Sequence, residues 1–285
     1  MTPYAVYDLF TDQPFAGNPL AVVFDAAELD TEAMVAITRE FNFSETTFIL
    51  PPEDSAHTAK VRIFTPSAEL PFAGHPTVGT ALALNARGAG AEQVLELGVG
   101  PIPVTIAEGR AEFVTRTPLT RGEEPEIARI AACLGLTEAA IRTKAHAPQM
   151  ASVGLSFCLV ELTDRASLTA MVTDLPAFRE AADRYSDRAN FGLFCYTRDG
   201  GTVHARMFAP TGGIPEDPAT GSASAALTAY LATLDASDLT LTIHQGEDMG
   251  RPSRIETRAT FSDGAVRSVA VAGRARKVME GQLTA

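Results

Sequence analysis

The chain of 285 residues has few cysteines, few basic residues and no long apolar run. Its three cysteines, Cys133, Cys158 and Cys195, form no Cys-x-x-Cys pair, which favours reduced thiols packed in apolar surroundings over a disulfide framework. The 23 Lys and Arg residues face 35 Asp and Glu residues, and this net charge of −12 argues against nucleic acids and anionic membranes as partners. No apolar run approaches the ~20 residues of a membrane span, and the N-terminus lacks a signal-peptide pattern. We therefore expect a cytoplasmic protein.

Several chemistries also lack their sequence signatures. There is no Gly-x-Gly-x-x-Gly or phosphate-loop motif for a nucleotide cofactor, and no Gly-x-Ser-x-Gly elbow for a nucleophilic serine. The histidines show no metal-ligand spacing; they are His57, His75, His146, His204 and His244. The sequence therefore predicts proton transfer with neither a cofactor nor a metal.

An internal repeat is the most informative feature that is present. The segment from Arg62 to Pro71 returns 144 positions later as Arg206 to Pro215, with four identities in ten pairs. Ordinary composition gives roughly one identity or fewer in such a window. The match resumes at a slightly different offset, where His75 aligns with Asp217. A period of half the chain predicts two similar lobes, which we place at residues 1–118 and 119–285.

The coarse pattern of elements predicts α+β lobes, each a curved sheet or barrel around one central helix. Short strands dominate, and helices are expected over 31–41, capped by Asp30, over 77–87, over 125–135 and near 137–143. Residues 116–126 make the best linker. Gly79 and Gly221 fall inside helical runs of small residues, where a close backbone approach explains a glycine.

Each repeat ends at a predicted helix start, and these two starts are the first candidate site. We expect His75 and Asp217 at the two cap positions, with a proline opening each helix. Plain capping is the simpler interpretation of either start alone. Two similar starts also offer N–H groups and positive dipole ends to a carboxylate ligand, with Gly74 and Gly213 allowing close approach. The sequence thus predicts an active site between the lobes.

Glu45 is the second candidate, because it lies among residues that otherwise look buried. An outward-facing position on a strand is the usual fate of a lone glutamate. The second lobe has no carboxylate at the corresponding position, which is Ala189 at the same offset or Leu193 if the Asn-Phe pairs are aligned. A desolvated glutamate has a raised pKa, which suits proton transfer near neutral pH. The loop 245–253, which follows the second helix, is a candidate wall of the cleft.

Five short motifs, in order along nearly the whole chain, resemble the phenazine-biosynthesis isomerase (PhzF-like) family. They are Phe15-Ala-Gly-Asn-Pro19, Ser44-Glu45-Thr46, Pro71-Phe-Ala-Gly-His75, Glu216-Asp-Pro-Ala-Thr-Gly-Ser222 and Met249-Gly-Arg-Pro-Ser253. This family is similar in fold to diaminopimelate epimerase, with two similar lobes, and its members are commonly homodimers without cofactor or metal. The resemblance therefore implies a diaminopimelate epimerase-like fold and a homodimer.

The resemblance also implies roles for individual residues. Glu45 would carry a proton across a cyclic, amino-acid-like substrate, while His75 and Asp217 would hold and polarise it. Gly74, Gly221 and Ser222 would supply hydrogen-bond donors at the helix starts. The implied reaction is the isomerisation of trans-2,3-dihydro-3-hydroxyanthranilate.

The related epimerases use two cysteines, and Ala73 and Glu216-Asp217 occupy those regions here, which excludes a two-thiol racemase. Two other functions remain open from the sequence. One is a small-acid binding protein that has lost catalysis, and the other is a lyase or hydratase acting on a small carboxylic acid.

Overall fold

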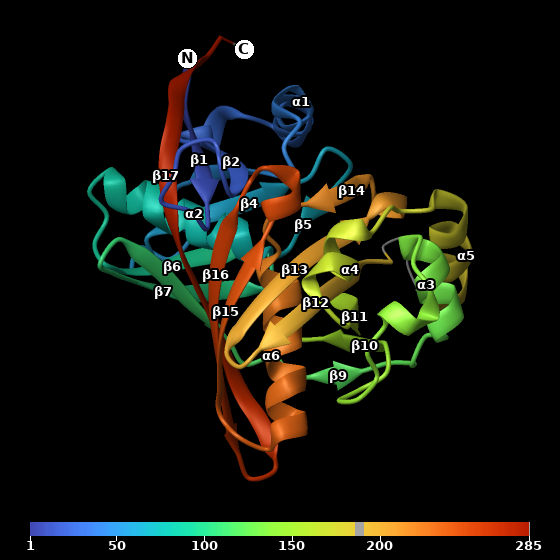
Figure 1. Ribbon diagram of the computed structural model, residues 1–285. Coiled ribbons are helices and arrows are strands. Elements are labelled where there is room, and N and C mark those ends of the chain that lie inside the picture. Colours follow the sequence, from blue (N-terminus) through green and yellow to red (C-terminus); the bar gives the residue numbers. More distant parts are fainter. Residues whose placement is uncertain (186–190, 285) are drawn as a thin grey trace. The chain divides into compact units, whose positions relative to one another are not determined.

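The computed structural model describes residues 1–185 and 191–284, which form two compact units (Figure 1). Unit 1 consists of Met1–Val114 and Val271–Ala285, and unit 2 is Thr115–Ala270. The prediction of 1–118 and 119–285 thus differs in the C-terminal segment, which belongs to unit 1. The reason is that β17 (Ala265–Leu283) pairs antiparallel with β1 (Thr2–Leu9), from Thr2 opposite Leu283 to Leu9 opposite Ala275. Ala189 lies outside the described residues.

In the described part of unit 1, eight strands pair in a closed ring. Besides β1 and β17, the elements of unit 1 are β2 (Asn18–Val23), η1 (Ala26–Glu28), α1 (Thr31–Phe41), β3 (Glu45–Leu50), β4 (Ala59–Phe64), β5 (Glu69–Leu70), α2 (Gly74–Ala86), β6 (Glu92–Leu97), β7 (Gly100–Ala107) and β8 (Arg110–Thr115). The ring runs β1, β2, β3, β4, β6, β7, β8, β17 and back to β1. Most neighbours are antiparallel, but β2–β3 and β4–β6 are parallel because α1 and α2 connect them.

Helix α2 is the central helix of unit 1. Nine of its residues are buried, and it contacts β1, β2, β3, β6 and β7. A helix apolar on all sides needs such a surrounding sheet. A Cβ on Gly79 would lie 2.5 Å from Cδ2 of Leu20 and 3.0 Å from Cδ1 of Leu9. The expected close approach at Gly79 is therefore confirmed.

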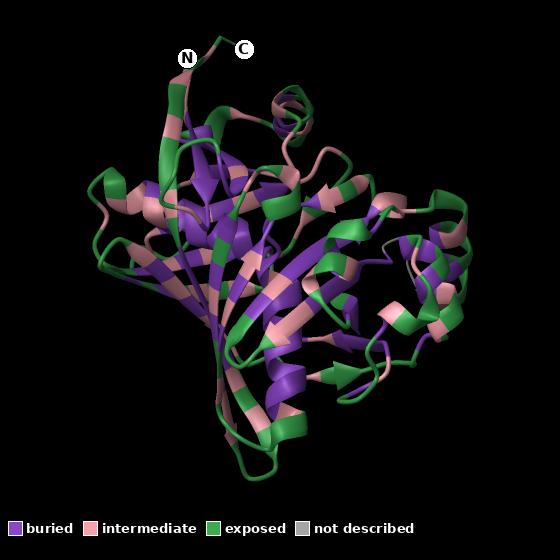
Figure 2. Ribbon diagram, viewed as in Figure 1, coloured by how far each residue is buried: buried purple, intermediate pink, exposed green. Residues whose placement is uncertain are grey.

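From its second long strand onward, unit 2 repeats the order of strands and α-helices that runs from β2 to β7 in unit 1, with one helix more. The elements of unit 2 are β9 (Thr120–Arg121), α3 (Ile127–Leu134), η2 (Glu138–Ala140), β10 (Gln149–Ser152), β11 (Ser156–Glu161), α4 (Arg165–Ala170), α5 (Leu175–Tyr185), β12 (Leu193–Asp199), β13 (Thr202–Ala209), η3 (Pro210–Gly212), β14 (Ile214–Asp217), α6 (Gly221–Asp235), β15 (Leu239–Gln245), η4 (Glu247–Met249) and β16 (Ser253–Ser262). The pairs β11–β12 and β13–β15 are parallel, as are β2–β3 and β4–β6. Figure 2 shows α6 buried along most of its length, as the prediction of a central helix requires.

Strand registers show which residues of the two units correspond. Leu70 of β5 pairs with Ile63, and Asp217 of β14 pairs with Met207, which is 144 positions after Ile63. Asp217 therefore corresponds to Leu70. The prediction that it corresponds to His75 is wrong, because Met207 and its partner Asp217 are 10 positions apart, with a register shift between β13 and β14, whereas Ile63 and Leu70 are 7 apart. Both helices begin at a glycine, so the counterpart of His75, the second helical residue, is Ser222.

Of the other predicted elements, some form as expected and one does not. Asp30 caps α1 by accepting the N–H of Ala33 at 2.8 Å, and Asp174 accepts the N–H of Ala177 at 2.8 Å in the corresponding α5. Near 137–143 only the 3-10 turn η2 forms, and its N-cap residue Thr137 makes no side-chain cap hydrogen bond. The linker at 116–126 contains the short strand β9 and begins at the boundary of the units.

The three cysteines and two clusters of apolar side chains lie in the core. Cys133, Cys158 and Cys195 are all buried with reduced thiols, as predicted, and burial raises the pKa of Cys133 to about 12. They lie in a cluster of unit 2 centred on α3, α5 and β11, while α1 covers a smaller cluster of unit 1 that includes Phe48 and Phe64. No helix in the described ranges is long and apolar enough to span a membrane.

Candidate active site

Glu45 and His75 lie side by side in unit 1. Glu45 opens β3, where it pairs with Leu20 of the parallel strand β2, and His75 is the second residue of α2. Oε2 of Glu45 is 3.4 Å from Nδ1 of His75, and the two side chains are only 14% and 6% exposed. The sequence predicted both residues as site members, and the structure brings them together. The predicted cap at His75 is wrong, since the extended residue Ala73 caps α2.

Burial gives the Glu45 carboxyl an unusual proton affinity. Desolvation raises its pKa to about 7, against a smaller lowering by the hydrogen bond with the Ser44 side chain. Among the described residues, Oε2 of Glu45 has no hydrogen-bond partner to stabilise its charge. A carboxyl group with a pKa near 7 can both accept and donate a proton at neutral pH. The outward-facing alternative for Glu45 does not hold.

Hydroxyl groups fix β3 against α2 next to this pair. Oγ1 of Thr80 donates to Oγ1 of Thr47 at 3.1 Å, and both residues are fully buried. One turn earlier, Oγ1 of Thr77 donates to the carbonyl of Ala73 at 2.8 Å. The first of these contacts joins the strand that carries Glu45 to the helix that carries His75, and the second lies within the start of that helix.

The loop before β2 supports the same end of β3. Oδ2 of the buried Asp8 accepts the N–H of Phe15 at 2.6 Å, and Phe15 has a left-handed backbone with φ of 64°. Gly17 also has a positive φ, and a Cβ there would meet the carbonyl oxygen of Leu9 at 2.1 Å. The loop leads to Asn18, whose Oδ1 accepts the hydroxyl of Ser44 at 3.2 Å. The Phe15–Pro19 motif therefore positions the residue that precedes Glu45.

Asp217 is the last residue of β14 in unit 2, and its side chain is buried. The sequence predicted that Asp217 caps α6, and this prediction is wrong. Thr220 is the cap residue, and Pro218 precedes the helix. Three residues separate Asp217 from the helix start, because β14 continues to Asp217 before the chain turns. Oγ1 of Thr220 donates to Oδ2 of Asp217 at 2.5 Å.

The loop predicted as a wall of the site supplies residues that hold Asp217. Nε2 of Gln245 donates to the carbonyl of Asp217 at 2.7 Å, and Oγ of Ser253 donates to the carbonyl of Pro218 at 2.8 Å. A Cβ on Gly246 would lie 2.7 Å from the same carbonyl oxygen of Pro218. Thr220 and Gln245 were missed as individual residues. Their only sequence signal is their place: Thr220 lies within the Glu216–Ser222 motif, and Gln245 begins the loop 245–253.

The remaining predicted binding residues occupy different settings. Gly74 and Gly221 are the buried first residues of α2 and α6, and Ser222 is half-buried beside Gly221. Gly213 is exposed at the end of η3 with φ of 84°, a conformation that favours glycine without any ligand. Within the described ranges, no cluster of three or more His, Cys, Asp or Glu side chains could hold a metal ion.

Comparisons with known proteins place the chain in one family. The model of the family described as "Phenazine biosynthesis-like protein" matches residues 7–281. An isomerase of Mesorhizobium japonicum, named as uncharacterized, is 40% identical over 98% of both chains. The trans-2,3-dihydro-3-hydroxyanthranilate isomerase of Pseudomonas aeruginosa is 35% identical over 99% of both chains. A crystal structure of a PhzF-family protein from Bacillus anthracis aligns with a TM-score of 0.87 and 25% identity, covering 100% of this chain and 99% of that one.

These likenesses define an enzyme of the isomerase class, since relatives at 35–40% identity over nearly the full length carry that name. The chain belongs to the PhzF-like family of phenazine biosynthesis-like proteins. The α+β fold with a central helix, the diaminopimelate epimerase-like architecture that the motifs implied, is thereby confirmed.

Proposed function

We propose that this protein moves a proton within a small cyclic or unsaturated carboxylic acid, without a cofactor, and that Glu45 carries the proton. The observation that supports this most directly is the buried Glu45 carboxyl, with its pKa raised to about 7, at 3.4 Å from His75. Near neutral pH both protonation states of Glu45 are populated, as a group must be that first takes and then returns a proton.

The proposed reaction balances without any other reactant. The Glu45 carboxylate takes a proton from one carbon, the C–H electron pair shifts the neighbouring double bond, and the protonated Glu45 returns the proton to a carbon further along. His75 and Asp217 hold and polarise the substrate while charge develops on it. Gly74, Gly221 and Ser222 at the helix starts, together with Gly213, are the proposed donors to the substrate carboxylate. That Asp217 and Glu45 serve the same substrate molecule is part of the proposal.

Trans-2,3-dihydro-3-hydroxyanthranilate is the proposed first substrate, because relatives at 34–35% identity are named as its isomerases. We further propose a cytoplasmic homodimer. Two other functions predict different results in the same assay. A binding protein would bind the compound without converting it, and a lyase or hydratase would release or add water.

The experiment follows turnover of this compound by ultraviolet absorbance and by NMR in H2O and in D2O. Wild type, Glu45→Gln and the control Glu53→Gln, an exposed acid of the same unit, are compared at equal concentration. We expect turnover with deuterium entering the product from wild type and the control, and a loss of roughly 10²–10⁴ in rate for Glu45→Gln. Full activity of a folded Glu45→Gln variant would refute the role of Glu45. Binding without conversion by wild type would refute the proposed reaction for this compound.

A further inference from the structure

The short segment that leads into the central helix, which we call the approach, is built the same way in both units. It comprises residues 70–73 in unit 1 and residues 217–220 in unit 2. Oγ1 of Thr77 donates to the carbonyl of the cap residue Ala73, and Oγ of Ser224 donates to the carbonyl of the cap residue Thr220, at 2.8 and 2.9 Å. A glycine packs against the proline of each approach: a Cβ on Gly98 would lie 2.7 Å from Cα of Pro71, as one on Gly246 would lie 2.7 Å from the carbonyl of Pro218. The two backbones therefore follow one path.

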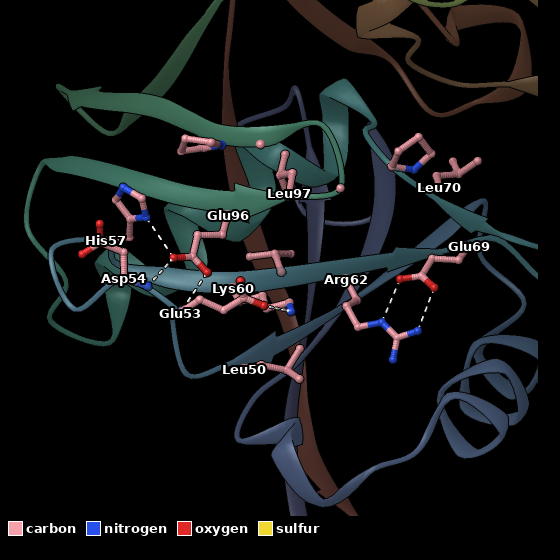
Figure 3. A pocket seen from close by; sticks show the side chains of 15 residues that line it. Leu50, Glu53, Asp54, His57, Lys60, Arg62, Glu69, Leu70, Glu96 and Leu97 are labelled. Atoms are coloured by element: carbon pink, nitrogen blue, oxygen red, sulfur yellow. Dashed lines mark hydrogen bonds and ion pairs between the residues drawn. The ribbon is translucent and has the colours of Figure 1, made fainter.

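At three positions on this path, unit 1 is apolar and unit 2 is polar. Asp217 corresponds to Leu70 by strand register, and the cap residue Thr220 corresponds to Ala73. Lys60 of β4 pairs with Glu96 of β6, and His204 of β13, which lies 144 positions after Lys60, pairs with His244 of β15. Glu96 and His244 therefore correspond, and so do the residues that follow them, Leu97 and Gln245. Figure 3 shows Leu70 and Leu97 lining a groove of unit 1. Because unit 1 makes the same approach with three apolar residues, the turn itself does not require the polar ones.

The polar side chains of unit 2 form one hydrogen-bonded set. Gln245, which is 1% exposed, accepts the N–H of Thr220 at 3.0 Å through Oε1 and donates to Oγ1 of Thr220 at 3.0 Å through Nε2. A hydroxyl group has one proton to donate. Since the Thr220 hydroxyl accepts from Gln245, its own proton is directed to Oδ2 of Asp217, 2.5 Å away. The contacts thus fix both the backbone and the carboxylate of Asp217.

Burying three polar side chains costs free energy unless each is hydrogen-bonded. Unit 1 has no such cost at the three corresponding positions, because its residues there are apolar. We infer that Thr220 and Gln245 are positioning residues, which hold the Asp217 carboxylate as an oriented acceptor for the substrate. This inference rests on the proposed function, in which Asp217 binds and polarises the substrate. Gln245 acts through Thr220, and Thr220 acts through Asp217.

A double-mutant cycle tests the inference. Thr220→Ala places the unit 1 residue at the cap and removes the hydroxyl; we expect a fall in kcat/KM on the order of 10² for trans-2,3-dihydro-3-hydroxyanthranilate, as for a displaced reacting group. Thr220→Ser keeps the hydroxyl and is expected to restore most of the activity. In an Asp217→Asn background, Thr220→Ala is expected to cause no further loss, because residues that act through one group are not additive. Thr233→Ala, which removes a similar hydroxyl bond to Ala229 lower on α6, is the control.

The outcomes separate this inference from the proposed function. If Asp217→Asn alone keeps full activity, the proposed role of Asp217 fails. If Asp217→Asn is inactive while Thr220→Ala and Gln245→Leu remain active, or if Thr220→Ala causes the same loss in both backgrounds, only the positioning inference fails. Crystal structures of Thr220→Ala and Gln245→Leu decide the matter independently of turnover. We expect the Asp217 carboxylate to rotate or shift, and an unchanged carboxylate in both variants would overturn the inference.

Discussion

Oε2 of Glu45 and Nδ1 of His75 lie 3.4 Å apart, at the first residue of β3 and the second residue of α2. A hydrogen bond between the buried hydroxyls of Thr80 and Thr47 joins the two elements. A carboxyl group held this way gains its raised pKa from the loss of water around it. The same desolvation that suits Glu45 to proton transfer therefore has a cost in folding stability.

This cost gives the first prediction, that Glu45→Gln stabilises the protein at high pH. The pKa of Glu45 rises from 4.5 to about 7 on folding, so the folded state binds the proton more tightly than the unfolded state. The destabilisation is absent below pH 4.5, develops between pH 4.5 and 7, and is complete above pH 7, at about 3 kcal/mol. Urea unfolding at pH 5 and pH 8 measures it. A difference between the variant and wild type that does not change with pH would contradict the assignment.

The second prediction concerns Glu96, which lines the same groove of unit 1 as Leu70 and Leu97 (Figure 3). Its carboxylate accepts the N–H groups of Asp54 and Glu53 at 2.8 Å and lies 2.9 Å from Nδ1 of His57, and these bonds lower its pKa to about 2. A lowered pKa stabilises the fold above the unfolded value of 4.5, and the stabilisation is lost as pH falls toward 2. We expect Glu96→Gln to lower Tm at pH 7 and to approach wild type near pH 2. The control is Glu92→Gln on the same strand.

The third prediction compares two arginine–glutamate pairs. In unit 2, Arg206 bonds Glu216 at 2.8 and 2.9 Å and also donates to carbonyls at the end of α4; the two side chains are 10% and 17% exposed. In unit 1, Arg62 bonds Glu69 at 2.7 Å in the same way, but these side chains are 23% and 42% exposed.

Replacement by methionine leaves each glutamate without its cation. We expect Arg206→Met to cost about 3–5 kcal/mol, since Arg206 is buried and the half-buried carboxylate of Glu216 loses its partner. Arg62→Met is expected to cost about 0–1 kcal/mol, because water replaces the lost contact. Equilibrium unfolding measures both. Equal losses in the two variants would show that burial does not set the strength of these pairs.

The fourth prediction tests the packing of the central helix. An added methyl group at Gly79 would lie 2.5 Å from Cδ2 of the buried Leu20, so packed leucine side chains must shift; we expect Gly79→Ala to cost about 1–3 kcal/mol despite its better helix propensity. Gly90→Ala is the control, since the nearest atom there is 3.9 Å away. A Gly79→Ala variant as stable as wild type would show that Leu20 and its neighbours repack around the added methyl group without cost.

The sequence was sufficient for the fold class, since the repeat around Arg62 and Arg206 and the small-residue helices both reflect the duplicated sheet and its central helix. It also located Glu45 and His75, because motifs mark them. The correspondence of His75 with Asp217 was wrong for a physical reason. Between paired residues the β13–β14 hairpin is three residues longer than the β4–β5 hairpin, and sequence identity does not reveal strand register.

Thr220 and Gln245 were beyond the sequence for a related reason. Each is an ordinary polar residue until strand pairing brings Gln245 beside the helix approach, 25 positions after Thr220. The C-terminal strand was likewise assigned to the wrong unit, since pairing of β17 with β1 joins residues at opposite ends of the chain. Long-range pairing of this kind leaves no local pattern.

The pairing of β1 with β17 also sets an order of events during synthesis. Unit 2 is one continuous stretch, so all its strands through β16 have been made before the ribosome adds the final residues of β17. At roughly 5–20 residues per second, β1 spends most of the translation time with one edge uncovered. Unit 1 can therefore complete its ring only once β17 has been made, after all the strands of unit 2 through β16.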